Sequence, residues 1–153
     1  MYKEIFNKIE KDNKNLYTFC MLKPDAIKRN IIGEIITMLE KKFTIIGMYL
    51  QRFTNEVAEN FYGIHKERVF FKDLIENITS DNVCGILLKI NNEDLNAITV
   101  LRDYMGVTNP SIAEKNTIRN IYGISIDENT IHGSDSRENF LKEIKIFFGI
   151  NNE

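Results

Sequence analysis

His132 is one of only two histidines in this chain, and it lies in the stretch NTIHGSDSRENF at 129–140. The residues that follow it at once are Gly133, Ser134, Asp135 and Ser136. One interpretation is a helix N-cap, in which Glu138 closes a capping box with Asp135. The other is a nucleophilic imidazole, where the glycine lets a substrate come close and the helix N-terminus attracts phosphate. The local sequence alone favours the capping interpretation.

Common phosphate-binding and metal-binding motifs are absent from the sequence. It contains no G-x-x-x-x-G-K-[ST], and no G-x-G-x-x-G follows an expected strand. It also lacks C-x-x-C and H-E-x-x-H, the spacings of frequent zinc sites. A nucleotide enzyme built from this chain would therefore hold phosphate with side chains.

The composition is that of an ordinary globular domain. At 153 residues, of which 43% are hydrophobic and 27% charged, the chain is long enough for one sizeable core. A formal net charge of −2 provides no global basic field, which disfavours nucleic acid as a partner. Cys20 and Cys84 each lie in an apolar run, so we expect buried free thiols and a reducing, cytoplasmic setting.

No stretch of the sequence is typical of a targeting or membrane segment. Residues 1–16 alternate charged residues with single apolar ones and lack the apolar core of a signal peptide. The longest apolar run, near VCGILL, is much shorter than the roughly 20 residues that span a bilayer. We therefore expect a soluble protein without a membrane partner.

Patterns of apolar residues predict the elements that must position any site. Expected strands cover 16–22, 43–51, 83–90 and 121–126. Expected helices cover Ile31 to Leu39, 55–66, 71–79, a segment capped by Asn92 that carries Leu95 to Met105, and 136–147. Apart from extra short helices the order is βαββαβ. This order predicts an α+β, ferredoxin-like fold, with a four-stranded antiparallel sheet and helices on one face.

Five motifs occur in the order and spacing of one enzyme family. They are TFCMLKPDAIKRNIIGEI at 18–35, FYGIHKERVFF at 61–71, MGVTNP at 105–110, NTIRN at 116–120 and NTIHGSDS at 129–136. On these motifs the chain resembles the nucleoside diphosphate kinase family. The resemblance implies an N-terminal extension at 1–16, either helical or flexible, a kinase-like domain at 17–149 and a C-terminal tail at 150–153.

The resemblance implies a role for the histidine and its neighbours. His132 takes the γ-phosphate from a nucleoside triphosphate, typically ATP, and passes it to a nucleoside diphosphate in a ping-pong scheme. Glu143 orients the imidazole ring, and Ser134 lies beside it. Without the resemblance, Glu143 would be interpreted as a solvated helix residue paired with a neighbouring lysine, and Ser134 is equally typical of a helix cap.

The remaining site residues implied by the resemblance hold the nucleotide. The basic side chains on the phosphates are Lys23, Arg102 and Arg119, the hydroxyl donors are Tyr62 and Thr108, the sugar-side residue is Asn129, and the base lies between Phe70 and Ile126. Stacking and apolar contact hardly distinguish bases, which predicts broad nucleotide acceptance. Outside the family pattern, Arg102 would indicate a solvated helix face and Phe70 core packing.

The resemblance also implies cofactor and partners. Mg²⁺ arrives with the nucleotide phosphates, and no protein side chain is expected to bind it. The chain is expected to form a homo-oligomer, with dimers assembled into a tetramer or hexamer. His65 is assigned no chemistry. The alternative function is a catalytically impaired nucleotide-binding or assembly module of the same fold.

Three departures from the family pattern concern loops. Val69 stands where proline usually precedes the Phe-Phe pair, and the turn at 90–95 is longer than usual. EKNTIRNIYG, at 114–123, lacks the usual Pro-Gly before Thr-Ile-Arg and Gly-Asp after it. This last segment lies in a loop that the family uses for subunit contacts, so it bears on the oligomer more than on activity.

Overall fold

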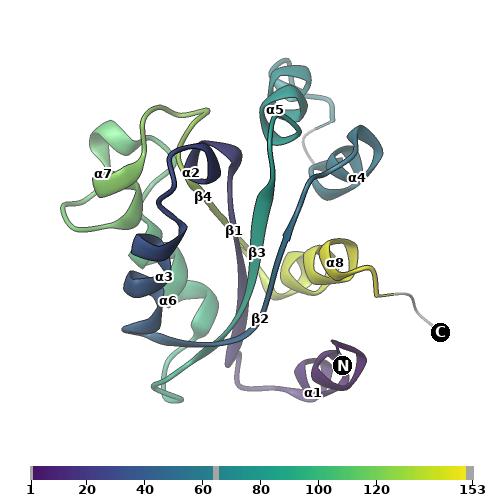
Figure 1. Ribbon diagram of the computed structural model, residues 1–153. Coiled ribbons are helices and arrows are strands. Elements are labelled where there is room, and N and C mark those ends of the chain that lie inside the picture. The colour runs from purple at the N-terminus through teal and green to yellow at the C-terminus, as the bar shows by residue number, and fades with distance from the viewer. Residues whose placement is uncertain (1, 64–65, 151–153) are drawn as a thin grey trace.

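The computed structural model describes residues 2–63 and 66–150, and its sheet has the strand order β2-β3-β1-β4 (Figure 1). The strands are β1 (Tyr17–Leu22), β2 (Phe43–Gln51), β3 (Val83–Ile90) and β4 (Ile131–Gly133). Each neighbouring pair is antiparallel. Helix α3 (Ile32–Glu40) lies between β1 and β2 in sequence, and α6 (Ala97–Met105) lies between β3 and β4. The fold is therefore the predicted ferredoxin-like βαββαβ arrangement.

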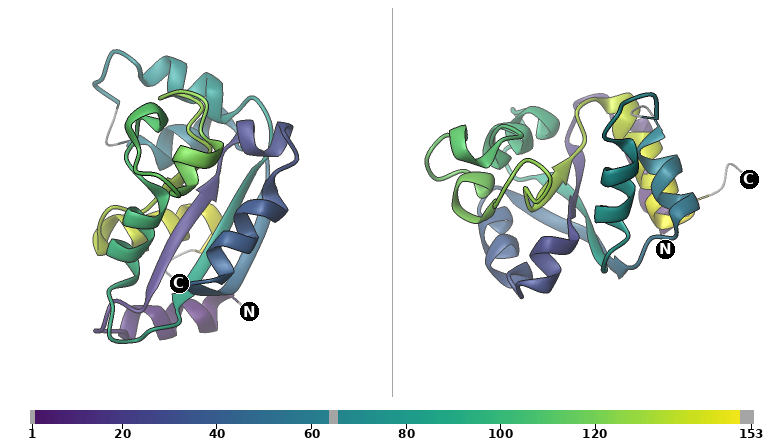
Figure 2. Two further views of the ribbon diagram at one scale, coloured as in Figure 1. Left: turned by 90° about the vertical axis from the view of Figure 1, so that its left-hand side faces the viewer. Right: turned by 90° about the horizontal axis from the view of Figure 1, so that it is seen from above.

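Helices cover both faces of the sheet, as the view from above in Figure 2 shows. The crossover helices α3 and α6 share one face with the short helices α2 (Pro24–Lys28) and α7 (Ile118–Tyr122). The other face carries α1 (Tyr2–Lys11), α4 (Asn55–Phe61), α5 (Phe71–Ile78) and α8 (Arg137–Phe148). The expectation of helices on one face holds for the crossover helices only, because the additional helices build a second core.

Strand β1 is buried along its whole length because both of its faces are covered. Phe19 and Met21 belong to the core beneath α8, whereas Cys20 and Leu22 belong to the core beneath α3 and α6. This alternation explains why the strand reads as a continuous apolar run. Cys20 is a free, buried thiol, as predicted, and so is Cys84.

The expected strand at 121–126 is wrong. Helix α7 ends at Tyr122, and the chain then turns. The fourth strand of the sheet is instead the three-residue β4. The apolar residues that suggested a strand, Ile121, Ile124 and Ile126, are each about half exposed. These isoleucines therefore do not form the buried face of a strand. Strand β4 is too short for a periodic pattern of apolar residues to appear in its sequence.

The helix expected from Asn92 begins later in the chain. Helix α6 starts at Ala97, and Asn96 caps it by accepting hydrogen bonds from the backbone N–H groups of Ile98 and Thr99. Asn92 instead accepts the N–H of Asp94 within the preceding turn. Two asparagines offered the same capping chemistry, and only the second one precedes a continuous helical stretch.

Helix α1 falls within the expected N-terminal extension and packs on α8. Its Phe6 and Ile9 are buried, and Arg137 of α8 donates to the Ile9 carbonyl at 3.0 Å. Helix α4 ends at Phe61, so the expected helix at 55–66 is shorter than predicted where the structure describes it. The part of that helix at 64–65, and with it His65, lies outside the described residues, as does 151–153 of the expected tail.

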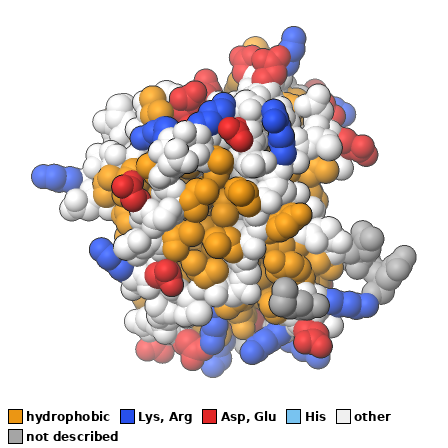
Figure 3. Space-filling view, viewed as in Figure 1, with side chains coloured by type: hydrophobic (Ala, Val, Ile, Leu, Met, Phe, Trp, Pro, Cys, Tyr) orange, Lys and Arg blue, Asp and Glu red, His pale blue; other side chains and the backbone are white. Residues whose placement is uncertain are grey.

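Strand β2 is an edge of the sheet, and it carries exposed apolar side chains. Met48, Tyr49 and Leu50 are each about half exposed. Hydrophobic side chains gather near the middle of the face seen in Figure 3. Across residues 2–63 and 66–150, no helix combines the length and apolar character needed to cross a membrane.

Candidate active site

A cleft of about 560 Å³ collects the residues that the sequence singled out. Every proposed site residue except Ser134 lines it: Lys23, Tyr62, Phe70, Arg102, Thr108, Arg119, Ile126, Asn129, His132 and Glu143. They come from the segment after β1, the α4–α5 region, α6 and the segment after it, α7, the segment before β4, β4 itself and α8. Residues more than 100 positions apart therefore meet at one cavity.

His132 lies in β4, where it pairs with Met21 of β1. The adjacent Gly133 is required by packing, because a Cβ at this position would run into the Met105 sulfur of α6. The sequence suggested that this glycine gives a substrate room. The structure shows instead that it admits a core side chain behind the histidine.

Glu143 fixes the imidazole ring of His132. Its Oε1 lies 2.7 Å from His132 Nε2 and accepts the Ser134 hydroxyl at 2.9 Å. An ionised carboxylate only accepts hydrogen bonds, so in the neutral imidazole Nε2 carries the proton and Nδ1 has the lone pair. No side chain in the described part of the chain hydrogen-bonds to Nδ1. Glu143 and Ser134 are both buried, which rules out a solvated helix face for the glutamate.

The start of helix α8 places Glu143, about two turns after the N-cap, next to His132. Ser136 is the N-cap and accepts the backbone N–H of Asn139 at 3.1 Å. Asp135 binds the side-chain amide of Asn139, so the expected capping box between Asp135 and Glu138 is wrong. Ser134 points its hydroxyl at Glu143 and does not cap the helix.

Two aromatic rings form a wall next to the histidine. The ring centroids of Phe61 and Tyr62 lie 5.2 and 5.7 Å from that of His132, both with edge-on geometry. Burial, together with the nearby Glu143 carboxylate, raises the pKa of Tyr62, so its hydroxyl remains protonated. The wall packs against the imidazole and places a protonated phenol in the cleft.

The two arginines bind the backbone on either side of His132. Arg119 is buried and donates to the Ile131 carbonyl at 2.7 Å and to the Gly106 carbonyl at 3.0 Å. Arg102 donates to the Gly133 carbonyl at 3.1 Å. Burial and the neighbouring Arg102 lower the pKa of Arg119 to about 10, so the guanidinium is charged at neutral pH. The pair thus fixes β4 and brings positive charge to the cleft.

Lys23 is the third cation of the cleft and is almost wholly buried. Its Nζ donates to the Asn129 side chain at 3.0 Å and to the Asp127 carbonyl at 2.9 Å. Burial lowers the pKa of Lys23 to about 8, an effect that nearby carboxylates oppose. The amide of Asn129 donates onward to the Thr108 carbonyl at 3.0 Å, so Asn129 joins two sides of the cleft.

Two apolar side chains stand at the mouth of the cleft. Phe70 is 46% exposed and Ile126 is 57% exposed, which excludes core packing for Phe70. Val69, the residue in place of proline, is fully exposed, so this departure removes no packing. The sequence reading missed Arg68, whose guanidinium carbon lies 5.7 Å from the Phe70 ring centroid and which also lines the cleft. Its position two residues before Phe70 was the available signal.

The acidic residues of the described chain do not form a metal cage. Within residues 2–63 and 66–150, no group of three or more His, Cys, Asp or Glu side chains is arranged to hold an ion. Asp127, Asp135 and Glu143 line the cleft, and the last of them is occupied by His132 and Ser134. Lys23, Arg68, Arg102 and Arg119 line the same cleft, so an incoming phosphate chain meets more positive than negative side chains.

Comparisons with known proteins find similar sequences and structures that cover most of the chain. The family model for nucleoside diphosphate kinase matches residues 17–152. A nucleoside diphosphate kinase of Lawsonia intracellularis is 44% identical over 133 residues, which cover 86% of this chain and 94% of that protein. One from Halalkalibacterium halodurans is 48% identical over 132 residues, covering 86% and 87%. The crystal structure of nucleoside diphosphate kinase from Encephalitozoon cuniculi matches with a TM-score of 0.81 and 36% identity, covering 90% of this chain and 91% of that one.

Proposed function

The chain belongs to the nucleoside diphosphate kinase family, and we propose that it transfers the γ-phosphate of a nucleoside triphosphate to a nucleoside diphosphate through phosphorylated His132. The observation that carries the residue assignment is the 2.7 Å hydrogen bond between His132 Nε2 and Glu143. It leaves the Nδ1 lone pair available in a cleft lined by four cations, Lys23, Arg68, Arg102 and Arg119. Residue roles below follow from this proposal.

The reaction consists of two in-line displacements at phosphorus. In the first, Nδ1 of His132 forms a bond to the γ-phosphorus while the bond to the β-phosphate oxygen breaks, and the nucleoside diphosphate leaves. In the second, a terminal oxygen of the acceptor diphosphate attacks the same phosphorus and the N–P bond breaks. The ring gains positive charge in the first step, and the Glu143 carboxylate stabilises it through the Nε2 proton.

Positive charge supplies the main stabilisation of phosphoryl transfer, since little covalent work falls to the protein. Lys23, Arg102 and Arg119 are assigned to the phosphate oxygens. Their hydrogen bonds to fixed carbonyls and to Asn129 pre-organise them before the nucleotide arrives. Tyr62, with its raised pKa, and Thr108 are assigned as neutral hydroxyl donors.

The base is assigned to the apolar pair at the mouth of the cleft, Phe70 and Ile126. A ring face and an aliphatic side chain offer contact area without a hydrogen-bond code, which supports broad base acceptance. Asn129 is assigned to the sugar side. A divalent cation, Mg²⁺ in our proposal, would be bound by the nucleotide phosphates and would neutralise part of their charge. The cations that line the cleft, among them Lys23, Arg102 and Arg119, suit phosphate oxygens and not a metal ion.

A homo-oligomer in which dimers assemble into a tetramer or hexamer is also part of the proposal. The exposed Met48, Tyr49 and Leu50 of edge strand β2 support it, because an unpaired apolar edge favours association. The two free, buried thiols support a reducing, cytoplasmic setting. A catalytically impaired binding or assembly module is not favoured, because a residue is present for each step of the transfer.

Steady-state kinetics test the reaction scheme. Initial rates should be measured with ATP varied at several fixed concentrations of dTDP. A covalent intermediate predicts parallel lines in the double-reciprocal plot, because the first product leaves before the second substrate binds. Intersecting lines would require both nucleotides to bind together and would contradict a phosphohistidine intermediate.

A further inference from the structure

Thr130 holds an unusual backbone conformation two residues before His132. Its φ is +79°, and the Ile131 N–H donates to the Asn129 carbonyl at 2.9 Å, which closes a γ-turn of the positive-φ type. Threonine is β-branched and rarely adopts such a φ, so the turn is strained. Strain of this kind persists only where the surroundings enforce it, and it concentrates at functional sites.

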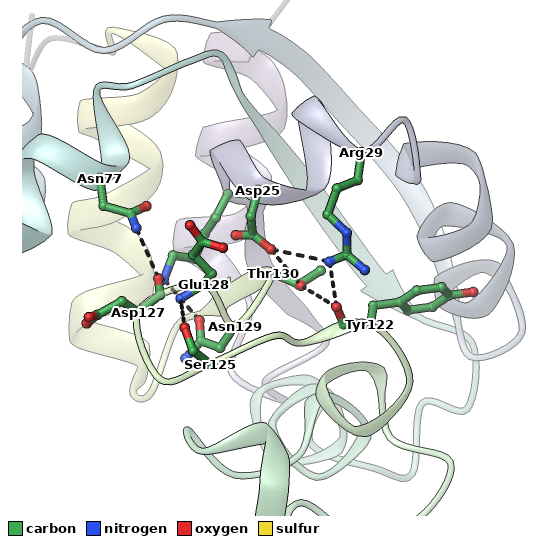
Figure 4. Close-up of polar contacts among 10 residues, drawn as sticks. Asp25, Arg29, Asn77, Tyr122, Ser125, Asp127, Glu128, Asn129 and Thr130 are labelled. Atoms are coloured by element: carbon green, nitrogen blue, oxygen red, sulfur yellow. Dashed lines mark hydrogen bonds and ion pairs between the residues drawn. The ribbon is translucent and has the colours of Figure 1, made fainter.

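A carboxylate far away in the sequence holds this turn. The fully buried Thr130 hydroxyl donates to Asp25 Oδ2 at 2.8 Å and also lies 3.2 Å from the Tyr122 carbonyl (Figure 4). Arg29 completes the cluster, with Nη1 at 2.6 Å from the Tyr122 carbonyl and 3.8 Å from Asp25 Oδ2. Asp25 therefore ties the segment before β4 to helix α2.

Both ends of the turn lead into the candidate site. On one side is Asn129, whose amide links Lys23 to Thr108. On the other side β4 begins and carries His132. The Thr130 carbonyl itself accepts the Lys23 backbone N–H at 2.9 Å. A change of conformation at Thr130 would thus move residues assigned to the phosphates, to the sugar and to the chemistry.

We propose that Asp25 is a positioning residue for phosphoryl transfer, which enforces the strained turn at Thr130 and so sets Lys23, Asn129 and His132 relative to the bound phosphates. The inference rests on the proposed function of the site. Asp25 does not line the nucleotide cleft and touches no substrate in this account. Its Oδ1 is buried and makes no hydrogen bond to the described residues, while Oδ2 accepts the Thr130 hydroxyl and carries the ion pair with Arg29.

That charge also acts on Lys23. Burial lowers the pKa of Lys23 to about 8, and Asp25 opposes this more than any other charged group. Asp127 and Glu128 raise the pKa as well, whereas Arg119 lowers it. Removing the Asp25 charge should lower the pKa of Lys23 below about 8, so that the lysine loses its proton at a less alkaline pH.

The turn is tested with Thr130→Val and Thr130→Ser. The valine variant keeps the shape but loses the hydroxyl, and we expect ADP to bind about tenfold more weakly by calorimetry, as for a lost hydrogen bond to a charged group. The serine variant keeps the hydroxyl and should restore binding. Thr18→Val is the matched control, because its buried hydroxyl makes no hydrogen bond to the described residues and lies outside the cleft.

The charge is tested with Asp25→Asn, which can still accept the Thr130 hydroxyl. The pH dependence of kcat/KM reports groups of the free enzyme. Its alkaline fall should move to lower pH in Asp25→Asn and stay in place in Thr130→Val. A folding defect alone would lower kcat/KM at every pH and would leave the pH of the alkaline fall unchanged.

The outcomes separate this inference from the proposed function. An inactive wild type would sink the proposed function itself. An active wild type whose ADP affinity is unchanged by Thr130→Val would overturn the positioning role, as would loss of binding that Thr130→Ser fails to restore. If Asp25→Asn does not fold, Thr130→Val and Thr130→Ser still test the positioning role. If the alkaline fall of kcat/KM stays at the same pH in folded Asp25→Asn, the proposed effect of the Asp25 charge on the pKa of Lys23 would be overturned.

Discussion

Glu143 Oε1 lies 2.7 Å from His132 Nε2 and 2.9 Å from the Ser134 hydroxyl, so one carboxylate oxygen fixes both the ring and its neighbour. The carboxylate is buried and is carried on α8, whose start is set by the Ser136 cap. This relationship assigns the ring proton to Nε2. Because α8 carries Glu143, the position of this helix affects the chemistry proposed at Nδ1 of His132.

Replacing Glu143 with glutamine should lower kcat more than it changes KM. The amide oxygen can still accept a hydrogen bond from the Nε2–H group but carries no charge to stabilise the ring as the N–P bond forms. We expect kcat to fall on the order of 10- to 100-fold with KM nearly unchanged, the pattern of an interaction made in the transition state. Steady-state rates with saturating ATP and a diphosphate acceptor measure this.

Glu138→Gln is the matched control for that change. Glu138 lies on the same helix but is exposed and away from the cleft. Its replacement should leave both kinetic constants unchanged. Equal losses in the two variants would mean that helix stability, and not the contact with His132, accounts for the effect.

Gly133→Ala should destabilise the protein, because the added Cβ would run into the Met105 sulfur. Overpacking of this kind costs about 1–3 kcal/mol in the free energy of unfolding, measured by urea denaturation. Gly33→Ala in α3 is the control, since a Cβ there meets nothing within 4 Å and should stabilise by up to about 1 kcal/mol. Similar stability of the alanine variant at 133 and the wild type would contradict the packing role.

The pH dependence of kcat/KM should show a descending limb near pH 8. The pKa of Lys23 is lowered to about 8 by burial, so the ammonium that attracts phosphate is lost as the pH rises through this value. In Lys23→Arg the guanidinium stays charged, and this limb should disappear even if the overall activity is lower. A limb that persists at the same pH in the arginine variant would assign the titration to another group.

The sequence predicted the βαββαβ order of the main elements and, apart from Ser134, only site residues that do line the cleft, but it missed Arg68. Long strands with continuous apolar runs, such as β3, were visible because both of their faces are buried. The motifs around Lys23 and His132 named residues that the fold brings to one cavity. The prediction came from the order of these motifs along the chain, because no single motif was sufficient for it.

The errors have physical reasons. The segment IYGISI at 121–126 is rich in residues that favour strands, but its isoleucines are exposed on a short helix and a turn. Strand β4 has only three residues in which to show a pattern. Gly133 was taken to give a substrate room, although Met105 fills the space in question. The contact of Thr130 with Asp25 joins residues 105 positions apart, and no local pattern indicates it.

The most direct test of the account is to incubate the protein with γ-labelled ATP in the absence of an acceptor diphosphate. The account predicts about one label per chain that is lost in acid, survives in base and transfers to added dTDP, as expected of a phosphohistidine. His132→Ala should take up none. Label that persists in His132→Ala, or a wild type that acquires none, would contradict the assignment of His132 as the phosphoacceptor.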